Sequence, residues 1–247
     1  MFVRKEKNVE VAQKQFSEPL SLGIKRLWFK LGEKVGNVEQ TKMSPDYIER
    51  EERYDGYKTC VDMLVERMEY CLQQNQNVLA NRKVDAPPGQ NPYEQLAKSL
   101  LSIVSFLPKD KQKSIQQMIA TSTNLAVLQR DEQVTGRHSI RHLRRFYLVE
   151  YKELMEERKH LERLRIEMDQ TRHNVKMSNT TEKIEKFALL YEQAVNDFDA
   201  QARRVIELFD RLPNIKKVHL NDIKELFVIL RNFNQKSAEA INLKEYE

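Results

Sequence analysis

His138 and His142 have a spacing that could serve metal chemistry, because residues four apart on a helix can place both imidazoles on one ion. Zinc hydrolases that use this spacing also need a glutamate beside the first histidine, whereas the stretch here reads His-Ser-Ile-Arg-His. The sequence suggests no third ligand nearby. We therefore interpret both histidines as ordinary residues of a basic helix face and expect no metal ion.

Other catalytic patterns are missing from the sequence. It contains no glycine-rich phosphate loop, no Gly-X-Ser-X-Gly elbow and no cysteine–histidine pair in the context of a triad. It also lacks a zinc finger, a helix-turn-helix signal and an aromatic platform for nucleic acid. We expect a protein that is not an enzyme, carries no cofactor and has no nucleic-acid partner.

The segment 17–36 has the pattern of a helix that lies on a membrane surface. Apolar residues recur at helical spacing and define one face: Leu20, Ile24, Leu27, Trp28, Leu31 and Val35. Cationic residues occupy the other side: Lys25, Arg26, Lys30 and Lys34. This arrangement predicts that the apolar face inserts into the bilayer while the cations bind lipid headgroups. The alternative is that the helix packs on the rest of the protein, as many amphipathic helices do.

Two further groups of basic residues are candidates for headgroup binding. The first shares a helix face and comprises Arg137, Arg141, Arg144 and Arg145. The second brackets an expected turn and comprises Arg172, His173, Lys176, Lys183 and Lys186. Both groups could contact anionic lipids. The alternatives are a solvated helix face with interleaved acids for the first group and a plain surface turn for the second.

The elements that would position these residues are long helices. About a third of the 247 residues are charged, and six glycines and seven prolines are too few for a compact fold with many turns. We expect a disordered extension over 1–16, the amphipathic membrane helix over 17–36, and one helical domain over 37–247. Within that domain the pattern predicts helix 1 over about 44–81 and 93–106, helix 2 over about 111–175 and helix 3 over about 181–243.

Apolar residues spaced three, four and seven apart predict a narrow seam along these helices. The residues expected in this core and dimer seam are Val61, Leu64, Met68, Tyr147, Leu154, Phe209, Leu226 and Leu230. The fold class is therefore all-α, an elongated antiparallel coiled coil of three long helices. No run of about 18 apolar residues is present, so nothing should span a bilayer. The net charge of +5 is consistent with an anionic partner.

Three stretches carry a resemblance to a known family. They are LGIKRLWFKLGEKVGNVEQTKMSPDY (22–47), YKELMEERKHLERLRIEMDQTRHNVK (151–176) and EQAVNDFDAQARRVIELFDRLPNIKKVHLNDIKELFVILRNF (192–233). In order and spacing they resemble the BAR domain of endophilin-like proteins, which begins with an amphipathic insertion helix. The resemblance covers about residues 20–240. The segment 84–92 falls near the insert that this family carries in its first helix, but it is shorter and less apolar.

The resemblance implies a BAR-like crescent homodimer whose concave basic face and tips bind anionic, curved bilayers, with the leading helix as a wedge. It also leaves room for hetero-partners among other BAR proteins. No Src-homology 3 module follows in the given chain, so recruitment of proline-rich partners is not expected. We expect a cytoplasmic, peripheral protein on the cytosolic face of membranes that senses or generates curvature in vesicle and endomembrane trafficking, including endocytosis. The alternative is a coiled-coil scaffold that docks other proteins without inserting into the membrane.

Overall fold

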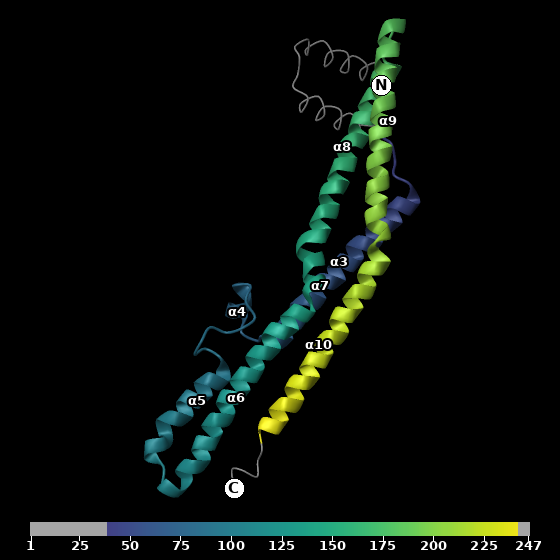
Figure 1. Ribbon diagram of the computed structural model, residues 1–247. Coiled ribbons are helices and arrows are strands. Elements are labelled where there is room, and N and C mark those ends of the chain that lie inside the picture. The colour runs from purple at the N-terminus through teal and green to yellow at the C-terminus, as the bar shows by residue number, and fades with distance from the viewer. Residues whose placement is uncertain (1–38, 242–247) are drawn as a thin grey trace, which may run out of the picture. The chain divides into compact units, whose positions relative to one another are not determined.

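A computed structural model describes residues 39–241, so the predicted amphipathic helix over 17–36 and the extension over 1–16 lie outside the described residues. Within the described range the chain is helical and contains no strand (Figure 1). The elements are α3 (Pro45–Leu72), α4 (Gln76–Ala80), α5 (Pro92–Ile103), the 3₁₀ turn η1 (Val104–Phe106), α6 (Lys109–Ser139), α7 (Arg141–Arg145), the π-helical turn η2 (Phe146–Glu150), α8 (Tyr151–Lys176), α9 (Thr181–Asp210) and α10 (Leu212–Ala240).

The described residues form two compact units. The first contains 39–49 and 154–209, and the second contains 50–153 and 210–241. The all-α fold expected from the apolar seam is therefore present, and α3 and α8 each contribute residues to both units.

The second unit is built around α6, which packs against α5 on one side and α10 on the other (Figure 1). Its largest fully buried side chain, Phe146, has its ring centroid 5.6 Å from that of Tyr54 and 5.3 Å from that of His219. Edge-to-face and tilted contacts of this kind add to the free energy gained from burial alone. Gly136 allows a close approach here, because a Cβ at that position would lie 2.5 Å from Leu72 Cδ2.

Helix α6 ends before Ile140, and a buried carboxylate caps the start of α7. Asp222 of α10 accepts hydrogen bonds from the backbone N–H of His142 at 2.9 Å and of Leu143 at 3.1 Å. A carboxylate in this position satisfies N–H groups that have no partner within a new helix. The expected helix over about 111–175 is thus interrupted by a turn at 140 and the π-helical turn η2.

The expected helix over about 44–81 is also divided, because α3 ends at Leu72 and α4 follows as a separate turn. The Gln73 side chain explains the break. Its Nε2 donates to the carbonyl oxygen of Val84 at 2.8 Å, and its Oε1 accepts from the backbone N–H of Asn75 at 2.9 Å. A buried amide that bonds two backbone segments offers the chain an alternative to continuing the helix.

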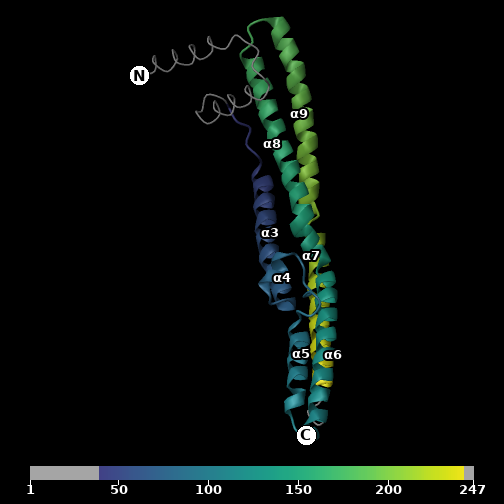
Figure 2. The ribbon, with the colours of Figure 1, turned by 90° about the vertical axis from the view of Figure 1, so that its left-hand side faces the viewer.

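The first unit pairs α8 with α9, which run side by side in both views (Figures 1 and 2). Its apolar core includes Leu154, Leu161 and Val205, each at most 1% exposed. The ring of Tyr47, at the start of α3, meets that of Phe209 edge-on at 5.5 Å between centroids. Gln201 of α9 donates to the carboxylate of Glu157 on α8 at 2.6 Å. Apolar burial and these polar contacts together hold the helix pair in register.

The residues predicted for the core and dimer seam differ in burial. Five are buried: Val61, Met68, Leu154, Phe209 and Leu226. Leu64 and Leu230 are half-buried, and Tyr147 is 41% exposed. The three that keep exposed surface are the ones available to a second copy of the chain, and their part in a dimer stays a prediction.

Candidate membrane-binding surface

Three of the predicted headgroup-binding arginines lie together in the second unit. Arg137 is on α6, and Arg141 and Arg144 are on α7, at intervals that share one helix face. Together with Val84, Asp85, Val134 and His138 they line an open groove of about 360 Å³, here called the arginine groove. The wall opposite the helices comes from the segment between α4 and α5. That wall was not anticipated from the sequence, although the breaker residues over 84–92 marked the segment.

Positive charge in the arginine groove is only partly balanced. The carboxylate of Glu69, on α3, lies 2.8 Å from the Nε of Arg144 and 3.8 Å from the Nε of Arg137. Burial lowers the pKa of the Arg137 guanidinium, repulsion from Arg144 lowers it further, and Glu69 and Asp85 oppose both effects. Arg141 is exposed, and its guanidinium donates a long hydrogen bond, at 3.4 Å, to the carbonyl oxygen of His138. The groove is therefore suited to an anion.

Arg145, the fourth residue of this predicted group, lies outside the groove. Its Nε pairs with Glu150 at 3.2 Å and its side chain is 69% exposed. The sequence placed all four arginines on one face, but the Arg145 side chain pairs with Glu150 and does not line the groove.

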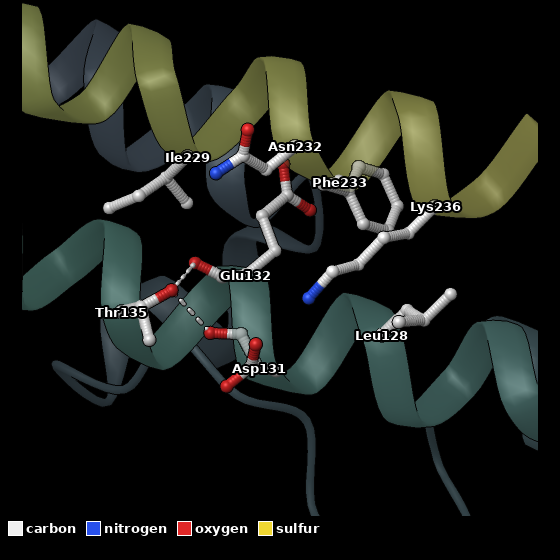
Figure 3. Close-up of a pocket in the computed structure, with 8 residues that line it drawn as sticks. All are labelled: Leu128, Asp131, Glu132, Thr135, Ile229, Asn232, Phe233 and Lys236. Carbon is white, nitrogen blue, oxygen red and sulfur yellow. Dashed lines mark hydrogen bonds between the residues drawn. The ribbon is translucent and has the colours of Figure 1, made fainter.

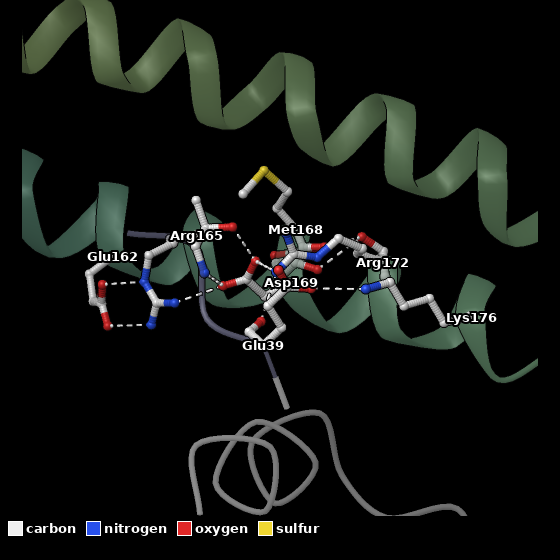
Figure 4. Close-up of polar contacts among 10 residues, drawn as sticks. Glu39, Glu162, Arg165, Met168, Asp169, Arg172 and Lys176 are labelled. Atoms are coloured by element: carbon white, nitrogen blue, oxygen red, sulfur yellow. Dashed lines mark hydrogen bonds and ion pairs between the residues drawn. The ribbon is translucent and has the colours of Figure 1, made fainter. Parts of the chain in front are cut away.

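The second predicted group surrounds the turn between α8 and α9 in the first unit. Arg172 donates to Asp169 at 2.8 Å and to the carbonyl oxygen of Glu39 at 2.7 Å (Figure 4). Lys176 pairs with the Glu39 carboxylate at 2.9 Å, and this lysine lowers the pKa of Glu39. The structure therefore assigns Arg172 a bonding role within the protein, which the sequence did not predict.

The remaining members of that group are more open to solvent. Lys183 and Lys186, in the first two turns of α9, are exposed and make no ion pair with another described residue. His173 is half-buried on α8. Met177 in the turn and Ile184 on α9 are exposed apolar neighbours, at 57% and 41%. Exposed lysines flanked by apolar side chains are suited to the surface of an anionic bilayer.

The structure places the two histidines in different surroundings. The Nδ1 of His142 lies 2.8 Å from Asp222 Oδ1, whereas His138 is exposed and faces the arginine groove. No cluster of metal-ligating side chains occurs among residues 39–241. His142 is instead part of the capping arrangement at the start of α7.

Apolar surface remains exposed on the second unit. Helix α5 has no buried residue. Its Leu101 is 63% exposed, and Phe106 in the following turn η1 is 85% exposed. On α10, Phe227 is 65% exposed. Large apolar side chains that remain this exposed typically mark an association surface. The apolar pattern over 93–106 is the signal that could have identified it from the sequence.

A small pocket of about 210 Å³ lies between α6 and α10 (Figure 3). Glu132 is buried in its wall, and desolvation raises the pKa of this carboxyl to about 7. Lys236 of α10 extends into the same pocket in Figure 3, but desolvation is the one cause that shifts the pKa of Glu132. Glu132 was not among the predicted site residues. Its place seven residues after Leu125 on the apolar stripe of α6 was the available signal.

Comparison with known proteins supplies the family. No helix among the described residues is both long enough and apolar enough to cross a bilayer. Comparison with curated proteins finds no match. The family model described as BAR domain matches residues 8–243. BAR domains are non-catalytic modules that generally dimerise and bind membranes, with association that is peripheral. The match covers nearly the whole chain, and the helices described above fit it, so this chain belongs to the BAR domain family.

Proposed function

We propose that this protein is an endophilin-like peripheral membrane protein that binds anionic phospholipid bilayers as a homodimer and senses or generates their curvature. Its place would be the cytosolic face of membranes in vesicle and endomembrane trafficking. The observation that carries the proposal is the arginine groove, in which three guanidinium groups face one opening with only two nearby carboxylates. Membership of the BAR domain family supports the same reading.

Two other regions would add to the affinity. Lys183 and Lys186 offer exposed charge beside apolar side chains on α9. The segment 17–36, which lies outside the described residues, has the sequence of an interfacial helix. One amphipathic helix binds membranes only weakly, so a second signal is needed for stable attachment. A dimer doubles each contribution, and linked sites raise overall avidity without any new contact.

The dimer would use the exposed apolar residues of the second unit. Leu101, Phe106 and Phe227 would otherwise expose large apolar side chains to water, at a free-energy cost proportional to their area. A second copy of the chain offers the same apolar surface, as the two-fold symmetry of a homodimer requires. The alternative function, a scaffold that docks other proteins, also draws on these residues and is separated from the first by the following experiment.

Co-sedimentation with vesicles tests the proposal directly. The wild-type chain should bind vesicles of phosphatidylcholine with phosphatidylserine, and both Leu27→Glu/Trp28→Glu and Lys183→Glu/Lys186→Glu should reduce the bound fraction several-fold. Lys111→Glu/Lys113→Glu is the matched control, because it makes the same charge change at exposed α6 positions outside the candidate surface. A wild type that does not bind, or a control that loses as much binding as the two test variants, would reject the proposal in favour of the scaffold.

A further inference from the structure

The pocket between α6 and α10 contains a buried carboxyl group without a partner (Figure 3). Glu132 is only 8% exposed, and its side chain extends from α6 toward Asn232 and Phe233 of α10. Its carboxyl receives no hydrogen bond or ion pair from the described residues, and burial alone raises its pKa. Because native proteins pair nearly all of their buried polar groups, a carboxyl left in this state points to a partner outside the chain.

The charges that line the pocket define the kind of partner. An ionised carboxylate accepts hydrogen bonds and donates none, so the partner of Glu132 is a donor, and a cationic donor forms the stronger bond. The other charged residues that line the pocket are Asp131 on α6 and Lys236 on α10. Two carboxylates and one ammonium leave a net charge of −1 when Glu132 is ionised. The pocket therefore matches a ligand with a single positive charge.

The walls of the pocket favour an organic cation over a metal ion. Residues 39–241 contain no group of three or more side chains that could hold a metal. Divalent ions such as Ca²⁺ and Mg²⁺ need about six oxygen ligands or more. Apolar walls are present instead, formed by Leu128, Ile229 and Phe233. Such walls can bury the carbon chain of an alkylammonium while a carboxylate binds its charged end.

The size of the pocket limits the carbon chain to a short one. Its volume of about 210 Å³ corresponds to roughly seven water molecules. A chain of about four carbons that ends in an ammonium stays within this space. Lys236 carries a group of the same chemistry, and its side chain extends into the pocket from α10 (Figure 3). It adds nothing to the pKa shift of Glu132, so the carboxyl remains uncompensated.

From these observations we infer that the pocket between α6 and α10 is a binding site for a primary alkylammonium group, whose nitrogen donates to Glu132 and whose carbon chain packs against Ile229 and Phe233. Lys236 is exposed, so its side chain can turn outward into solvent when the ligand enters. Asp131, also exposed, adds a second negative charge to the lining. A free amine and a lysine side chain both carry this group, and the experiment below distinguishes them. The site goes beyond the proposed function and does not depend on membrane binding.

Saturation-transfer nuclear magnetic resonance measures the binding of n-butylamine to the full chain from pH 6 to pH 8. The amine stays protonated over this range, as a lysine side chain does, so a change in affinity reports on the protein. The wild type should bind about tenfold more tightly at pH 8 than at pH 6, because the ionised fraction of a carboxyl with a pKa of about 7 rises by that factor. A wild type that does not bind, or that binds equally at both pH values, would overturn the inference.

Three variants locate the bound amine. Glu132→Gln should lose the pH dependence and most of the binding at pH 8. Glu225→Gln is the matched control, because it makes the same chemical change at an exposed α10 position outside the pocket, and it should keep both. Lys236→Gln should strengthen binding several-fold, because it removes a like charge from the pocket. Circular dichroism checks that each variant is folded. Binding by Glu132→Gln equal to that of the wild type would overturn the inference.

Two further ligands test the chemical class and the source. 1-Butanol has the same carbon chain without the charge and should bind about tenfold more weakly, since it lacks the charge-assisted hydrogen bond. Equal binding of the alcohol and the amine would reject an ammonium site. Nα-acetyl-lysine methylamide carries the same ammonium on a peptide backbone. Tighter binding of butylamine would support a free amine as the ligand, and tighter binding of the lysine derivative would support a protein segment.

Discussion

Two buried carboxylates, one in each unit, are treated in opposite ways by the fold. Asp169 on α8 has no exposed side-chain surface and is surrounded by donors: Arg165 at 2.7 Å, Arg172 at 2.8 Å, and the backbone N–H of Thr41 at 3.0 Å. Glu132 on α6 is almost as buried, but its carboxyl receives no hydrogen bond or ion pair from the described residues.

The comparison separates a buried charge that the protein satisfies with its own donors from one that it leaves without a partner. At Asp169 the protein satisfies its own buried charge, and Arg172 is part of that arrangement before it can serve any ligand (Figure 4). At Glu132 the desolvation of the carboxyl is uncompensated, so the protein carries a cost that depends on pH. Glu132 lies in the pocket between α6 and α10, which Ile229 and Phe233 of α10 also line.

The largest effect is expected when the satisfied carboxylate is removed. Asp169→Asn should lower the free energy of unfolding by about 3 kcal/mol, because Arg165, only 3% exposed, would keep its charge without a buried counter-ion. Urea denaturation followed by circular dichroism measures this. Glu162→Gln is the matched control, since it removes a half-exposed partner of the same arginine. It should cost only about 0.5 kcal/mol. Equal losses in the two variants would mean that Asp169 is not the centre of the cluster.

Removing the charge of the unsatisfied carboxylate, Glu132, should raise the free energy of unfolding instead of lowering it. The pKa of Glu132 is raised from 4.5 to about 7 in the folded protein, so the folded state holds its proton more tightly than the unfolded state. Its stabilising contribution is therefore complete below about pH 4.5 and is lost as the pH rises through about 7. Glu132→Gln should raise the free energy of unfolding by about 2 kcal/mol near pH 8.

The same substitution should have little effect near pH 5, where the glutamic acid is already neutral. Thermal unfolding of wild type and Glu132→Gln across this pH range measures the difference. Asp131→Asn is the control, because Asp131 lines the same pocket but is exposed. A stabilisation of Glu132→Gln that is the same at both pH values would show that the ionisation of Glu132 is not its source.

A smaller change in the free energy of unfolding should distinguish Arg172 from Lys176, which the sequence analysis placed in one basic group. Arg172→Gln should lower the free energy of unfolding by about 1 kcal/mol, because it removes a charged donor from the buried Asp169. Lys176→Gln should leave the stability unchanged, because Lys176 and Glu39 are both mostly exposed. Chemical denaturation of both variants tests this. A loss in Lys176→Gln as large as that in Arg172→Gln would contradict the division between structural and available charge.

The sequence was sufficient for the fold class and for much of the packing. Spacings of three, four and seven identified Leu154, Phe209 and Leu226, which are buried, because helical periodicity alone fixes which residues share a face. It could not locate the break at Leu72, which depends on a hydrogen bond from Gln73 to Val84. Nor could it separate Arg141 from Arg145, because the pairing of Arg145 with Glu150 depends on side-chain conformations that spacing along a helix does not show.

The candidate site also depends on contacts between distant segments, which the sequence does not reveal. Residue types found the cations, but the groove also needs the wall formed by Val84 and Asp85, which tertiary contacts place opposite α6 and α7. The pairing of Arg172 with Asp169 could not be separated from a free surface arginine by spacing alone, because basic and acidic residues three apart occur on many solvated helices. Contacts between distant segments decide which cations are free to bind a ligand.

The most direct measurement for the central claim is a titration of the full chain with vesicles of phosphatidylcholine alone and with phosphatidylserine, repeated from low to high ionic strength. Binding through the exposed arginines and lysines should require the anionic lipid and should weaken steadily as salt screens the charges. Binding to neutral vesicles with the same affinity, or binding that does not change with salt, would contradict it.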